Sequence, residues 1–255
     1  MSLRTVKAED IEQNADENVG AVPFQPPSVY TFILLACIGG VFVTQFATSS
    51  DPEFFQIDRY SAFFAGFDKQ AFLHGHEYWR ILTGATIHSG VLHVVMNSYA
   101  LYSFGRLVEL LSNRAHLSIV FILSALGGGL LSLVFNPEGT SVGASGGIVG
   151  LLSYLAVYAF RRRQFISPEF RKNLLINIGF ILVFGLVLFN VVDNYGHIGG
   201  LIAGAVYGAL QIPGDAYVDP RQAGSVTKVI GVVAVLLYIL ASVLSIVLLL
   251  NGRSQ

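Results

Sequence analysis

The sequence predicts an all-α membrane protein, a polytopic helix bundle with seven transmembrane spans. Of its 255 residues, 53% are hydrophobic and only 12% are charged, whereas a soluble domain carries about 25% charged residues. Several apolar runs are close to the roughly 20 residues that a helix needs to cross the hydrocarbon core. The single cysteine, Cys37, excludes an internal disulfide, and a net charge of −1 gives no indication of nucleic-acid binding.

The apolar runs locate the seven spans. In chain order they are Val29 to Ala47, about His88 to Leu111, about Leu117 to Phe135, about Ser145 to Phe160, Leu174 to Val191, about Tyr195 to Leu210, and Val229 to Leu250. A polar tail, residues 1–28, precedes them and lacks the basic start and apolar centre of a signal peptide. The long connection at 48–86 mixes charged and aromatic residues, which predicts that it lies in the membrane interface.

The lysines and arginines predict the orientation. With a cytoplasmic N-terminus, only four of the 15 fall on the opposite side: Arg59, Lys69, Arg80 and Arg253. The excess lies in short loops, where the positive-inside rule applies best. The acidic residues of the tail do not fit a mitochondrial transit segment. We therefore expect a multi-pass protein of the plasma membrane or a secretory-pathway membrane, in contact with the lipid bilayer.

With this topology the second, fourth and sixth spans all begin at the outer face, and each begins with polar residues. The second carries His88, His93 and Asn97, the fourth begins at Ser145, and the sixth carries His197. His93 and Asn97 share one helix face because they are four residues apart. Polar and ionisable residues within a membrane are costly and by default mark a functional site.

These side chains suggest nucleophilic chemistry. A serine hydroxyl is a weak nucleophile until a base takes its proton, and His197 could be that base for Ser145. The backbone N–H of Ser145 and the side chains of His93 and Asn97 could stabilise the resulting oxyanion. Glycines at small-xxx-small spacing would let the fourth and sixth spans approach closely. They are Gly143, Gly146, Gly147, Gly150, Gly200, Gly204 and Gly208.

Taken together, these motifs resemble those of the rhomboid family of intramembrane serine proteases. The matching positions are Gly143-Ala144-Ser145-Gly146, then His88, His93 and Asn97, then His197, Gly200 and Gly204, and also Trp79-Arg80, Gly105 and Glu109. The resemblance covers a six-helix core. It divides the chain into the tail (1–28), the core (29–211), and a loop with the seventh span and a short end segment (212–255).

The resemblance implies a Ser145–His197 dyad without a carboxylate, with His93 and Asn97 assisting the oxyanion. It implies single-span membrane proteins as substrates, and neither a cofactor nor a metal is expected. Val149 departs from the family pattern, since many relatives carry an aromatic residue there. The rate should fall as the pH drops through the pKa of the base, which is about 6.5 for an ordinary histidine. The sequence predicts no oligomeric state.

Two other functions fit parts of the pattern. One is a catalytically silent, rhomboid-like binder of membrane segments. The other is a proton-coupled transporter using His93 and His197, although the inverted repeats of many transporters are missing.

Several single residues also have alternatives. His88 could orient the loop or bind water at the outer rim, or it could have a purely structural role. Asn97 could instead form an inter-helix hydrogen bond. We expect Asp193 to be a solvated surface charge and Glu109 to pair with Arg106. We interpret Trp79-Arg80 as an interfacial anchor whose arginine bonds loop carbonyls.

Overall fold

In the computed structural model, residues 28–49, 59–188, 191–215 and 217–252 are described. Each predicted span corresponds to a helix: α2 Val29–Thr48, α6 Val91–Leu111, α7 Arg114–Phe135, α8 Ser145–Arg161, α9 Pro168–Val187, α10 Asn194–Gln211 and α11 Ser225–Gly252. The predicted tail lies almost entirely outside these residues. The predicted helical membrane bundle is confirmed.

Four of these helices, α2, α7, α9 and α11, are long and apolar enough to cross a membrane by length and composition. Helix α8 is apolar but shorter, and α6 and α10 carry the polar and glycine residues described above. The count of seven spans therefore stays a prediction.

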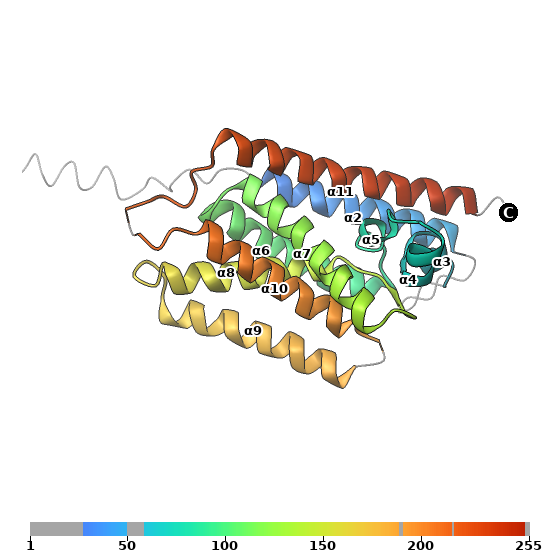
Figure 1. The fold of residues 1–255 in the computed structure, drawn as a ribbon, viewed down its shortest axis with the longest axis horizontal. Helices are drawn as coiled ribbons and strands as arrows, with labels where there is room; N and C mark the ends of the chain where they lie inside the picture. The colour runs from blue at the N-terminus through green and yellow to red at the C-terminus, as the bar shows by residue number, and fades with distance from the viewer. Residues whose placement is uncertain (1–27, 50–58, 189–190, 216, 253–255) are drawn as a thin grey trace, which may run out of the picture.

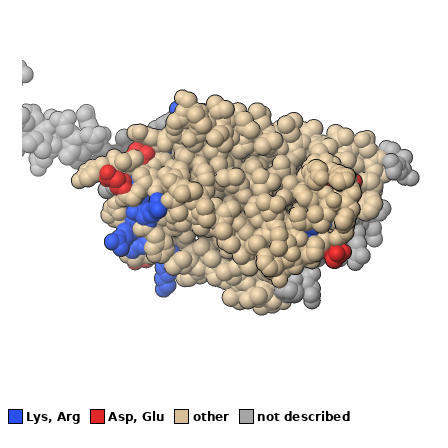
Figure 2. All heavy atoms as spheres, in the orientation of Figure 1, with Lys and Arg blue, Asp and Glu red and all other residues tan. Residues whose placement is uncertain are grey.

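The long helices run along the long axis of the molecule (Figure 1). Helix α11 packs along α2 and α7, while α9 lies on the opposite side against α8 and, more weakly, α10. In Figure 2 the lysines and arginines gather near one end of the visible face, and a wide band without charge separates the two ends. This distribution is expected of an integral membrane protein.

Helices α6 and α9 differ most clearly from the spans predicted for them. Helix α6 begins at Val91 rather than His88, because Gly90 is extended and ends the preceding loop. Helix α9 begins at Pro168, where Ser167 caps it by accepting a hydrogen bond from the backbone N–H of Phe170. It ends at Val187, four residues before the predicted end.

The described part of the long connection folds into short elements at one end of the bundle (Figure 1). These are α3 Arg59–Ala65, β1 Phe67–Asp68, α4 Lys69–His74 and α5 Arg80–Thr83. Strand β1 pairs antiparallel with β2, Thr140–Ser141, with Phe67 opposite Ser141 and Asp68 opposite Thr140. The all-α prediction did not include this pairing, which joins the connection to the loop before α8.

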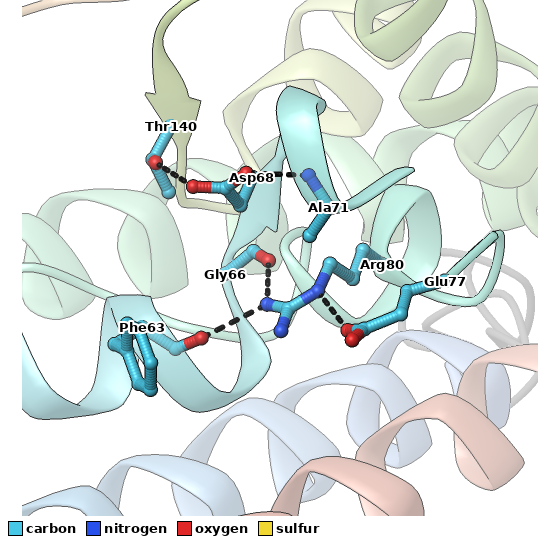
Figure 3. A network of polar contacts seen from close by, with 7 residues as sticks. All are labelled: Phe63, Gly66, Asp68, Ala71, Glu77, Arg80 and Thr140. Atoms are coloured by element: carbon cyan, nitrogen blue, oxygen red, sulfur yellow. Dashed lines mark hydrogen bonds and ion pairs between the residues drawn. The ribbon is translucent and has the colours of Figure 1, made fainter. Parts of the chain in front are cut away.

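Arg80 holds the connection together from inside (Figure 3). Its Nη1 donates to the carbonyl oxygens of Phe63 and Gly66, both at 3.0 Å, and its Nε pairs with Glu77. The guanidinium also lies over the Trp79 ring, 4.7 Å from its centroid. The predicted bonding of Arg80 to loop carbonyls is confirmed.

Glycines set the spacing of α7, α8 and α10. A Cβ added at Gly200 would collide with the carbonyl of Gly146, and one at Gly204 with the carbonyl of Gly150. Gly199 likewise faces the backbone of Gly127 in α7. The predicted close approach of the fourth and sixth helices is confirmed, and α7 joins them.

The predicted Glu109–Arg106 pair is wrong. The Glu109 carboxylate instead caps α2, accepting hydrogen bonds from the backbone N–H groups of Tyr30 (3.0 Å) and Thr31 (3.1 Å) and from the Thr31 hydroxyl (2.6 Å). Free N–H groups and the dipole at a helix N-terminus favour a carboxylate there. Arg106 lies over the ring of Tyr102.

Candidate active site

Ser145 and His197 lie within hydrogen-bond distance, although 52 residues separate them. The Nε2 atom of His197 is 2.9 Å from the Oγ of Ser145. Ser145 is the first residue of α8, and His197 lies in the first turn of α10. Because α8 and α10 meet through glycines, the two helix starts are held side by side.

Gly143 shapes the loop that presents Ser145. Its φ of +120° belongs to the region that favours glycine, and its N–H donates to the Gly84 carbonyl at 2.9 Å. A Cβ at this position would also approach the His93 ring to 2.8 Å. Any larger residue would therefore displace either the loop or the histidine.

His93 and Asn97 lie against this loop on one face of α6. The Nδ1 of His93 accepts from the backbone N–H of Ser89 at 3.4 Å, so the ring proton of the neutral form lies on Nε2. This Nε2 is the atom near Gly143, and the Asn97 Nδ2 is the next closest side-chain atom there. Asn97 is buried, and its Nδ2 has no hydrogen-bond partner among the described residues. Two donors thus point toward the loop before Ser145.

His88 is fully buried, which favours the structural role over a place at the outer rim. Its backbone N–H donates to Gln45 Oε1 at 3.0 Å, and Gln45 Nε2 donates back to its carbonyl at 2.9 Å. Its ring packs edge to face on that of His93, 5.0 Å between centroids. Because His88 lies before α6 rather than on it, its depth could not be derived from helical rise.

Asp193 is not the predicted solvated surface charge. It is half-buried and caps α10, accepting from the Gly196 N–H at 2.9 Å, and it also accepts from the Ser141 hydroxyl. Its carboxylate does not bond the second ring nitrogen of His197, whose Nδ1 has no partner among the described residues. The geometry is that of a serine–histidine pair without a carboxylate.

A small cavity of about 50 Å³ adjoins Ser145. Its lining includes the backbone of Gly143 and Gly146 and the polar side chains of Ser141 and Asp193. One water needs roughly 10–15 Å³ of such space. The cavity therefore has room for a few waters beside the serine hydroxyl.

Comparison with known proteins identifies the family of the chain. A model of the Rhomboid domain matches residues 75–214, more than half of the chain. The chain belongs to the rhomboid family. The matched region includes Ser145, His197, His93 and Asn97. Helices α2 and α11 lie outside it.

Relatives come from bacteria, plants and animals. Rhomboid protease GluP of Bacillus subtilis is 37% identical over 128 residues, covering 50% of this chain and 25% of the relative. RHOMBOID-like protein 2 of Arabidopsis thaliana is 30% identical over 202 residues, covering 71% and 61%. Inactive rhomboid protein 1 of Danio rerio is 31% identical over 130 residues, covering 50% and 15%. The chain thus spans less than two thirds of the length of each.

Lys69 and Ser141 were not among the predicted site residues, but the structure places both beside the candidate site. The Lys69 Nζ donates to Ser141 Oγ at 2.6 Å. A lysine that follows Asp68 in a charged loop gives no sequence signal of burial. The one available signal was Ser141 itself, a polar residue four positions before Ser145.

Proposed function

We propose that the protein is an intramembrane serine endopeptidase that cleaves transmembrane segments with a Ser145–His197 dyad. The observation that carries the proposal is the 2.9 Å contact between His197 Nε2 and Ser145 Oγ, in a chain of the rhomboid family. A nucleophile and a base within hydrogen-bond reach are the signature of an activated serine.

The steps follow from the positions of the donors and the base. His197 Nε2 takes the proton of Ser145 as Oγ attacks the scissile carbonyl, and the Ser145 N–H, His93 Nε2 and Asn97 Nδ2 stabilise the oxyanion. The imidazolium then gives its proton to the leaving amine, and the C–N bond breaks. Water, deprotonated by His197, attacks the acyl-enzyme, and the proton returns to Ser145 as the acid product leaves.

The substrate class is a protein with a single transmembrane segment, which would enter sideways from the bilayer. Entry between α6 and α9 is supported by the sparse packing of α9, in which Leu174 and Gly185 are the buried residues. The N-terminus is proposed to be cytoplasmic, in the plasma membrane or a secretory-pathway membrane. Exposed Arg161 and Arg163, at the far end of α8 from Ser145, support that orientation.

The test is labelling of the detergent-solubilised protein with a fluorophosphonate probe. Wild type and Ser153→Ala should label, because Ser153 lies two turns further along α8 and, among the described residues, its hydroxyl bonds only the Gly150 carbonyl of its own helix. Ser145→Ala and His197→Ala should not label while remaining folded. Labelling of wild type that falls as the pH is lowered, because the base becomes protonated, would identify a histidine base. Undiminished labelling of Ser145→Ala would sink the proposal.

A silent binder of membrane segments is the second candidate, since one relative carries the name Inactive rhomboid protein 1. Here both members of the dyad are present and hydrogen-bonded, which favours the protease. Folded wild type that binds a membrane-segment peptide but neither cuts it nor reacts with the probe would favour the binder.

A further inference from the structure

Lys69 is a fully buried lysine at the start of α4. Its Nζ donates to the Ser141 hydroxyl at 2.6 Å, and it lies 5.6 Å from the centroid of the Phe67 ring. A buried ammonium group is costly unless it is paired and hydrogen-bonded. Its position therefore calls for a structural or functional reason.

The bond from Lys69 continues to the helix that carries the base. Ser141 accepts from Lys69 and donates its own proton to Asp193 Oδ2. Asp193 caps α10 through Gly196. Ser141 lies four residues before Ser145, and Asp193 lies four residues before His197. One lysine is thus linked to both chain segments that carry the dyad.

Electrostatics supports the same link. Burial lowers the pKa of Lys69, while the carboxylates of Asp193 and Asp68 raise it. Asp68 in turn accepts from the Thr140 hydroxyl at 3.1 Å (Figure 3), next to Ser141 on β2. Two carboxylates from different parts of the chain therefore favour the charged form of Lys69.

We propose that Lys69 is a positioning residue for the Ser145–His197 pair. Through Ser141, its ammonium group holds the loop before α8 and the cap of α10 in the register that brings the two side chains to hydrogen-bond distance. Ser141, Asp193 and Ser145 also line the same small cavity, so a shift of the link reaches the nucleophile directly. The inference rests on the proposed function, because it concerns the efficiency of that dyad.

The experiment measures fluorophosphonate labelling of the full chain at increasing probe concentrations. The variants are Lys69→Met, Asp193→Asn and the double variant. The matched control is Lys172→Met, which removes an exposed lysine from α9. Lys69→Met should lower the maximal labelling rate per folded molecule roughly tenfold to a hundredfold, because a small misplacement of reacting groups has an effect of that size. The half-saturating probe concentration and the control should stay near wild type.

The double variant tests the link itself. Asp193→Asn should slow labelling in the wild-type background and add little to Lys69→Met, since residues in one network are not additive. Effects that multiply, or a Lys69→Met variant that labels at the wild-type rate, overturn the proposal. If Lys69→Met does not fold, Ser141→Ala breaks the same link; slow labelling supports the proposal and a wild-type rate overturns it.

A second readout separates this inference from the protease proposal. Nitrogen-15 NMR of the His197 ring reports its hydrogen bond to Ser145 without requiring activity. A folded wild type that the probe does not label would contradict the protease proposal. Even if the wild type does not label, the positioning role is supported when Lys69→Met or Ser141→Ala loses the nitrogen-15 signal of the His197 ring that is hydrogen-bonded to Ser145. An unchanged signal in these variants would overturn the positioning role.

Discussion

Helices α8 and α9 are neighbours in sequence and in space, but they are held in different ways. Twelve of the 17 residues of α8 are buried, whereas α9 buries Leu174 and Gly185 among its 20. Helix α8 meets α10 backbone to backbone through glycines, while Gly179 of α9 has nothing within 4 Å of an added Cβ. The dyad is therefore built where protein packs on protein, and α9 faces mainly lipid.

The difference teaches where precision is needed in this bundle. Without a hydrophobic driving force between helices in lipid, close packing of small residues is what fixes their spacing. Ser145 and His197 lie on the two helices that are fixed in this way. Helix α9 has large apolar side chains that lipid tails can surround equally well, so its packing fixes the position of the dyad less than the packing of α8 on α10 does.

The largest expected effect comes from Gly204→Val in α10. Its side chain would meet the Gly150 carbonyl and, at 2.6 Å, the Ser153 hydroxyl. Backbone cannot yield as a flexible side chain can, so we expect loss of the folded state and of labelling. Gly179→Val is the control and should unfold at the wild-type temperature in detergent. Equal melting of the two variants would contradict the contrast between α8 and α9.

An intermediate effect is expected from Asn97→Ala. Removing one donor to an oxyanion typically lowers the rate by about 10²–10³. The measurement is turnover of a transmembrane-segment peptide, with KM near the wild-type value. Asn177→Ala is the matched control, because within the described part of the chain the Asn177 side chain on α9 bonds only the Asn173 carbonyl of its own helix. If Asn97→Ala kept full turnover, Asn97 would be a packing residue.

The smallest effect is expected from Leu186→Ala in α9. Its side chain is 68% exposed, so truncation should change the free energy of unfolding by less than about 0.5 kcal/mol. Leu155→Ala in α8, where the leucine is fully buried, should cost about 2–5 kcal/mol. Unfolding in SDS–detergent mixtures measures both variants. A similar cost for the two would mean that α9 packs as tightly as α8.

Much of this architecture is predictable, because length and hydropathy mark the membrane helices and short motifs mark the site. Ser145, His197, His93 and Asn97 were found in this way, since each has a polar side chain in an apolar stretch. The structure brings all four together at one end of the bundle, through the dyad contact and the loop around Gly143.

The errors concern helix ends and loops, whose contacts leave no periodic pattern in the sequence. Asp193 was interpreted as solvated because the first turn of α10, whose N–H it caps, is not visible as a pattern. His88 was placed on the second span, but Gly90 is extended and the helix begins at Val91. The β1–β2 pairing and the Lys69–Ser141 bond join residues more than 70 positions apart, and strands of two residues carry no periodic signal.

Ser145 and His197 are 52 positions apart, and this separation has a consequence for how the protein is made. During synthesis Ser145 reaches the membrane long before α10 does, and a serine without its base is an ordinary alcohol. On the proposed function, a partly made chain cannot cut other membrane segments, because the nucleophile becomes reactive only when α10, the last helix that carries the site, has been inserted.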